Sequence, residues 1–142
     1  MSASPVYGKQ YIRFAESGRV DTNVAIDQFV LVTIDNAPVT APATAALMVA
    51  AGECWGVIQQ KFNLATSGFA TDLNRQATIA TSGLLLVQAD AANLQAQNDA
   101  LLVNAAGKSS SAGGAVTQNG TTPVVRQAVQ VGGLNYVLVS FS

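Results

Sequence analysis

From Phe29 onward the chain is a succession of short apolar and β-branched runs separated by turn-forming pairs. The runs lie at 29–34, 54–62, 69–73, 76–81, 84–89, 100–105, 123–131 and 135–142. Between them stand Asp35-Asn36, Ser67-Gly68, Ser82-Gly83, Ala106-Gly107, Asn119-Gly120 and Gly132-Gly133. Strand-length runs with turn signals at such spacings are typical of all-β domains. The pattern predicts a small β-barrel or β-sandwich and leaves the choice between them open.

Two segments compete with strands as helices. Residues 43–52 are rich in alanine and end on Gly52, which suits the position after a helix C-terminus. We therefore expect at most one short helix, at this place. Residues 90–100 have apolar positions too weak to bury a face, so we expect a loop there. The last run alternates, and we expect Val137, Val139 and Phe141 to point into the core.

The first 24 residues differ from the rest of the chain. They mix aromatic and basic side chains with neither a helical stripe nor sustained alternation. This favours an extended N-terminal arm at 1–24 that docks elsewhere, followed by a β domain at 25–142. A frayed terminus with one edge strand is the alternative. The candidate interface residues in this segment are Tyr7, Tyr11, Arg13, Phe14 and Arg19. Arg75 and Arg126, on later β runs, are two further candidates; the alternative is that each is a plain solvated side chain.

Charge and hydropathy exclude several classes of partner. Only 11% of residues are charged, the net charge is -1 and histidine is absent. Nucleic-acid binding needs clustered Lys and Arg, so we expect none. The longest uncharged apolar stretch, 36–52, is interrupted by Pro38 and Pro42 and is too short to span a bilayer. The first residues carry no apolar segment of the secretory type, so we expect neither a membrane partner nor export by that route.

The stretch "AAGKSSSAGG", 105–114, tests the idea of a nucleotide enzyme. A phosphate-binding loop needs a glycine where Leu102 stands, and a helix after the Gly-Lys pair. Neither is present in the sequence. We expect instead a turn with a positive φ at Gly107, Lys108 as its solvated tip, and a flexible surface loop after it that only a neighbouring chain would order.

Other catalytic patterns are also missing. No carboxylate pair has a spacing that implies a shared cleft, and no histidine can activate a serine. A serine–lysine pair stays open but has no positive support. We expect the acidic side chains beside turns to bond backbone amides: Glu53, Asp72, Asp90 and Asp99.

The single cysteine and the single tryptophan are adjacent. Cys54 is predicted to be a small buried apolar residue, and Trp55 a core residue rather than a ligand platform. With one cysteine, the chain cannot form an internal disulfide or a thiolate metal cluster. We predict no enzyme activity, no metal and no cofactor.

Taken as one pattern, residues 25–142 resemble the small capsid decoration, or cement, proteins of tailed bacteriophages. "AIDQFVLVTIDNAPVTAP" is similar to the opening strand and turn of that family, and "CWGVI" to its next strand. The segment from "NLATSGFATDL" to "NDALLVNAAGK" is similar to its central part, and "PVVRQAVQVGGLNYVLVSFS" to its closing section. The chain departs from the family at Asn98, where glycine commonly precedes the aspartate, at Gln28 after Asp27, and in its longer N-terminal segment.

The resemblance implies a non-enzymatic virion protein on the outer surface of an expanded icosahedral capsid. It also implies a homotrimer whose partner is the major capsid protein and which joins adjacent capsid subunits. Other phage structural parts, such as a tail-tube or fibre module, and a glycan-binding β module are the alternatives. A tail-tube protein should form rings or stacked tubes, and a glycan binder should expose clustered aromatic side chains.

Overall fold

A computed structural model describes residues 10–21, 24–36, 42–63 and 75–142. The described residues contain strands and turns and no helix, which confirms the all-β prediction. The strands are β1 Tyr11–Arg19, β2 Leu31–Asn36, β3 Thr44–Leu47, β4 Gly52–Glu53, β5 Gly56–Ile58, β6 Gln76–Gln88, β7 Leu102–Val103, β8 Gly114–Thr117, β9 Val124–Val131 and β10 Leu134–Phe141.

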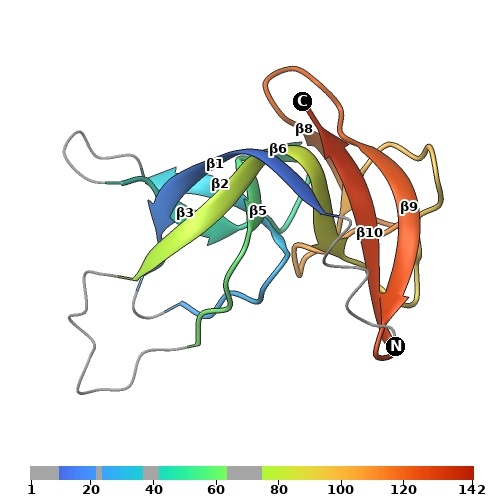
Figure 1. Cartoon of the computed structure of the whole chain (residues 1–142), viewed down its shortest axis with the longest axis horizontal. Coiled ribbons are helices and arrows are strands. Elements are labelled where there is room, and N and C mark those ends of the chain that lie inside the picture. Colours follow the sequence, from blue (N-terminus) through green and yellow to red (C-terminus); the bar gives the residue numbers. More distant parts are fainter. Residues whose placement is uncertain (1–9, 22–23, 37–41, 64–74) are drawn as a thin grey trace.

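The long strand β6 connects the two halves of the molecule (Figure 1). At Ile79 and Ala80 it pairs with both β1 and β5, and at Gly83 and Leu84 with both β1 and β10. Strand β1 therefore occupies one edge of β6, while β5 and β10 follow one another along the other edge. The order of the main sheet is β1-β3-β2-β5-β6-β10-β9, and the β1–β6 pairing closes its first five strands into a ring.

The prediction of two strands separated by a turn at Ser82-Gly83 is wrong, because β6 runs without a break from Gln76 to Gln88. Gly83 has a φ of +126°, and a Cβ there would lie 2.1 Å from the carbonyl oxygen of Tyr11. The glycine therefore marks a close approach of the β1 backbone rather than a chain reversal. The β1–β6 register shifts next to it, between Ile12 and Ala15.

The one short helix that the sequence allowed at 43–52 does not form. Thr44–Leu47 forms β3, which pairs antiparallel with β2, and Gly52–Glu53 forms β4, which pairs with β8. Ala45 is buried in the core cluster beneath β2, β5 and β6. Alanine has the highest helix propensity, but propensity is a weak determinant, and the pairing of this segment with β2 outweighs it. The loop expected at 90–100 is confirmed, since turns and bends occupy it.

The hydrophobic core consists of two clusters, one in each half of the molecule. One cluster lies among the strands of the closed ring and includes Val30, Ile58 and Ile79. A larger cluster surrounds β6, β10 and the segment between β6 and β9. Val137, Val139 and Phe141 are buried as predicted, but Tyr136 and Leu138 on the opposite face are buried too. Both faces of β10 are therefore covered, which alternation alone did not indicate.

The stretch 105–114 is ordered by the chain itself, so the prediction of a flexible surface loop is wrong. Gly107 has the predicted positive φ, at +73°, and no helix follows it. Ser109 and Ser110 are almost completely buried. The Ser109 amide donates to the Gln88 carbonyl over 2.9 Å, and its hydroxyl donates to Gln95 Oε1 over 2.8 Å. These bonds satisfy polar groups whose burial would otherwise destabilise the fold.

The two later turn predictions are confirmed by their backbone angles. Asn119 and Gly120 both have positive φ, as do Gly132 and Gly133, which connect β9 to β10. Paired positive φ values match the right-handed twist of the flanking strands, so these sequence pairs favour tight reversals.

Candidate interaction surface

Strand β1 is exposed on both faces over most of its length. Every residue from Tyr11 to Ser17 is exposed, including Tyr11 at 63% and Phe14 at 64%. One edge of β1 pairs with β6. On the other edge, the pairing with a described strand is at Arg19, opposite Thr44 of β3. The segment from Tyr11 to Gly18 is thus an edge strand with large aromatic side chains in solvent, a combination that attracts a further strand or partner.

The structure places part of the N-terminal segment within the β domain. Tyr11–Arg19 pairs with β6 from Tyr11–Leu84 to Arg19–Gln76, so these residues form an edge strand rather than an arm that docks elsewhere. The bounds of the predicted arm, 1–24, stay a prediction. Tyr7 and the other residues of 1–9 lie outside the described residues.

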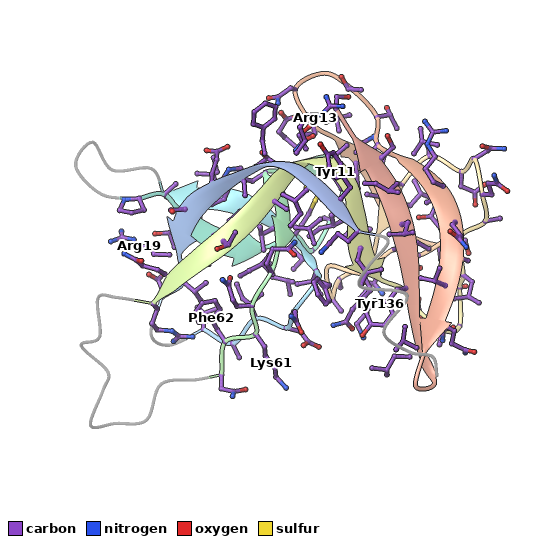
Figure 2. The ribbon with its side chains drawn as sticks, in the orientation of Figure 1. Tyr11, Arg13, Arg19, Lys61, Phe62 and Tyr136 are labelled. Atoms are coloured by element: carbon purple, nitrogen blue, oxygen red, sulfur yellow. The ribbon has the colours of Figure 1, made fainter. Side chains whose placement is uncertain are left out.

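The structure gathers part of the predicted interface on this strand. Figure 2 shows Tyr11 and Arg13 toward one end of β1 and Arg19 at the other end, and Phe14 lies on the same strand. The Arg19 side chain is half-buried, and its Nε donates to Thr44 Oγ1 over 2.8 Å. Arg19 therefore holds β1 to β3, in addition to facing solvent.

The other two predicted arginines are not part of this surface. Arg126 is exposed on β9, at the opposite end of the sheet order. Arg75 is only 8% exposed, so it is neither a solvated side chain nor an accessible anchor. Its Nη2 donates to the carbonyls of Val24 and Asn63 over 3.0 and 2.9 Å, and its guanidinium lies 5.3 Å from the Phe62 ring centroid. Arg75 joins the segments before β2 and after β5 to β6, a role that an isolated charge in a β run does not reveal.

A hollow of about 710 Å³ opens beside β1. Its lining includes Phe14 and Glu16 of β1, Ile34 of β2, Glu53 and Trp55 around β4 and β5, and Gln118 after β8. Gln118 is buried, and its amide nitrogen donates to the carbonyls of Trp55 and Thr81 over 3.0 and 2.9 Å. Segments far apart in sequence thus form one wall, which no local pattern predicts.

Trp55 is partly buried: it packs against the core cluster of the closed ring, as predicted, and it also lines the hollow. Its indole nitrogen donates to Glu16 Oε2 over 3.4 Å. The ring packs on Gly18 of β1, where a Cβ would lie 2.7 Å from the ring edge. Because β1 crosses the indole at a glycine, the ring is half covered and one part of it lines the hollow.

Cys54 is buried as predicted. Burial, together with the nearby Glu53 carboxylate, raises the pKa of its thiol to about 12. The acidic side chains beside turns also behave as predicted within the described residues. Glu53 accepts from the Asn119 amide, Asp90 from the Ala92 amide and Asp99 from the Ala96 amide. Asp72 lies outside the described part of the chain.

Comparisons with known proteins add nothing to this geometry: no protein family, curated protein or solved structure matches the chain. Among the described residues, no helix is long and apolar enough to cross a membrane. The same residues contain no group of three or more His, Cys, Asp or Glu side chains placed to hold a metal ion.

Proposed function

We propose that this chain is a capsid decoration, or cement, protein of a tailed bacteriophage. In this proposal a homotrimer binds the outer surface of the mature icosahedral capsid. It clamps adjacent major capsid protein subunits together and catalyses no reaction.

The observation that carries the proposal is the exposed edge of β1. Main-chain N–H and C=O groups on an open edge accept an extended segment of another protein without special side chains. Tyr11 and Phe14 add apolar contact area there, and aromatic side chains are enriched at protein interfaces. Three such edges on one trimer act together, so a weak contact at each subunit gives firm attachment.

Composition agrees with a protein partner. The charged fraction is 11% and the net charge is -1, so long-range attraction to a polyanion does not compete with docking. The resemblance of residues 25–142 to cement proteins supports the particular choice of a capsid surface.

A glycan-binding module is the second candidate. The observation that favours it is the hollow, where Trp55 and Phe14 lie beside Glu16, since aromatic faces and carboxylates both bind sugar rings.

Light scattering and cosedimentation test the proposal. We expect the purified chain to have the mass of a trimer and to pellet with undecorated shells of its own major capsid protein. A stable monomer that stays in the supernatant would overturn the proposal. Open rings or stacked tubes would indicate a tail-tube module instead.

A further inference from the structure

The charge of the hollow beside β1 is not neutralised by its own lining. Among the described residues, its charged side chains are the carboxylates of Glu16 and Glu53. The hydrogen bonds that they accept come from neutral donors. Glu16 accepts from the Trp55 indole, and Glu53 accepts from the Thr117 hydroxyl over 3.1 Å and the Asn119 amide over 2.8 Å.

These bonds fix the carboxylates without exhausting them. Each carboxylate oxygen has two lone pairs, so both groups can accept further N–H donors. Since Glu53 is already oriented by two hydrogen bonds, a guest does not have to order it on binding. The hollow therefore favours a guest that is cationic and carries several N–H groups.

The remaining walls favour a guest with a flat, weakly hydrated surface. The Trp55 indole packs on Gly18 and donates to Glu16, and the exposed side chains of Phe14 and Ile34 also line the hollow. A cation over the face of an aromatic ring is attracted by the ring quadrupole, and tryptophan is the best such ring. A guanidinium group meets both requirements, because it is planar and presents its N–H donors as a fork.

We infer that the hollow binds an arginine side chain presented by a partner protein. This inference rests on the proposed function and deepens it, since Phe14 and Glu16 belong to the same β1 that is proposed to dock on the capsid. Arginine fits better than lysine, whose ammonium is compact and strongly hydrated. It fits better than a sugar, because a neutral ring forms no charge-assisted hydrogen bond in which donor and acceptor are both ionised. The volume of about 710 Å³ also leaves room for the backbone that carries the guest side chain.

The single tryptophan of the chain makes the hollow directly observable. The full-length protein is titrated with N-acetyl-arginine amide while Trp55 fluorescence is recorded. N-acetyl-citrulline amide, which has nearly the same shape without the charge, and a neutral methyl glycoside are titrated in parallel. We expect a saturable change with the arginine compound alone. An equal response to the citrulline compound, a response to the glycoside only, or no response to any probe would overturn the inference.

Variants identify the groups responsible. Glu16→Gln combined with Glu53→Gln keeps the hydrogen-bonding shape, and we expect it to weaken binding of the arginine compound about tenfold. Asp21→Asn, which removes an exposed charge outside the hollow, should bind the compound as the parent does. Unchanged binding by the double variant, with circular dichroism identical to the parent, would contradict the assignment.

The proposed function and this inference fail separately. Capsid binding by a protein that does not respond to the arginine compound would overturn the inference and leave the cement proposal standing. A specific response to the compound without capsid binding would overturn the cement proposal and leave the arginine site standing.

Discussion

Gly56 at the start of β5 lies directly against the backbone of β6. A Cβ at this position would be 2.2 Å from the Ala80 carbonyl oxygen and 2.9 Å from Ile79 Cγ2. We expect Gly56→Ala to lower the free energy of unfolding by about 1–3 kcal/mol, because the strands must separate to admit the methyl group. Urea denaturation measures this loss.

Gly120 provides a control for that substitution. It has a φ of +77° and open space around its Cα, so Gly120→Ala introduces backbone strain without a clash. That strain costs about 1 kcal/mol. A smaller loss for Gly56→Ala than for Gly120→Ala would show that the approach of β5 to β6 is less close than described.

The Cys54 thiol tests burial in the same region. With a pKa raised to about 12 by burial first and by Glu53 second, the group is protonated at pH 8 and shielded from solvent. We expect an aromatic disulfide reagent to label the native protein only as fast as the chain unfolds, and to label it at once in concentrated urea. Rapid labelling of the native protein at pH 8 would contradict the packing around β5.

At the scale of elements, β10 carries two leucines in contrasting environments. Leu138 is 2% exposed and pairs with Leu86 of β6, whereas Leu134, at the hairpin end of the same strand, is 62% exposed. We expect Leu138→Ala to cost about 2–5 kcal/mol of stability. Leu134→Ala should change stability by no more than about 0.5 kcal/mol. Thermal unfolding of both variants measures these losses. Similar losses of stability for the two variants would contradict the burial of both faces of β10.

The turn that follows β6 makes the stability of the fold depend on pH. Hydrogen bonds from the Asn93 side chain, the Ala92 amide and the Ser110 hydroxyl lower the pKa of Asp90 below 3.8. The charged form is thus favoured in the folded state, and its stabilising effect is present above the unfolded pKa and lost as pH falls through the folded pKa.

We therefore expect Asp90→Asn to unfold at a lower temperature than the parent at pH 7. The difference should begin to shrink below the unfolded pKa of about 3.9 and disappear once the pH lies below the folded pKa, where the parent has also lost the charge. Calorimetry at several pH values measures this. A gap between Asp90→Asn and the parent that stays constant across the pH range would contradict the linkage.

At the scale of the whole molecule, the edge of β1 is the surface proposed to meet the capsid. Replacing Tyr11 and Phe14 together by serine removes apolar contact area from two side chains that are mostly in solvent. We expect the double variant to keep its melting temperature within a few degrees and to lose most of its cosedimentation with capsids. Leu134→Ser removes an equally exposed apolar side chain elsewhere and should pellet as the parent does. Full capsid binding by the double variant would show that the capsid contact does not lie on β1.

Much of the fold class was predictable, because its signals are local. Alternation in β10, the paired turn residues Asn119-Gly120 and Gly132-Gly133, and the acidic side chains beside turns each depend on a few neighbouring residues. So does the failure of "AAGKSSSAGG" as a phosphate-binding loop, since the missing glycine and helix are visible in the stretch itself. In the candidate site, Tyr11 and Phe14 stay predictions from composition, and the structure adds that both lie on the exposed strand β1.

What the amino-acid order determined, then, is an all-β chain with turns at Gly107, Asn119-Gly120 and Gly132-Gly133. Only the tertiary structure decided that Thr44–Leu47 is a strand, that β6 continues through Gly83, and that Ser109 and Arg75 are buried. It also decided that Glu16, Glu53 and Trp55 share one hollow. The physical reason is common to all of these. Pairing and burial depend on partners distant in sequence, such as Gln76 opposite Arg19, and those contacts outweigh the weak preferences of a short segment.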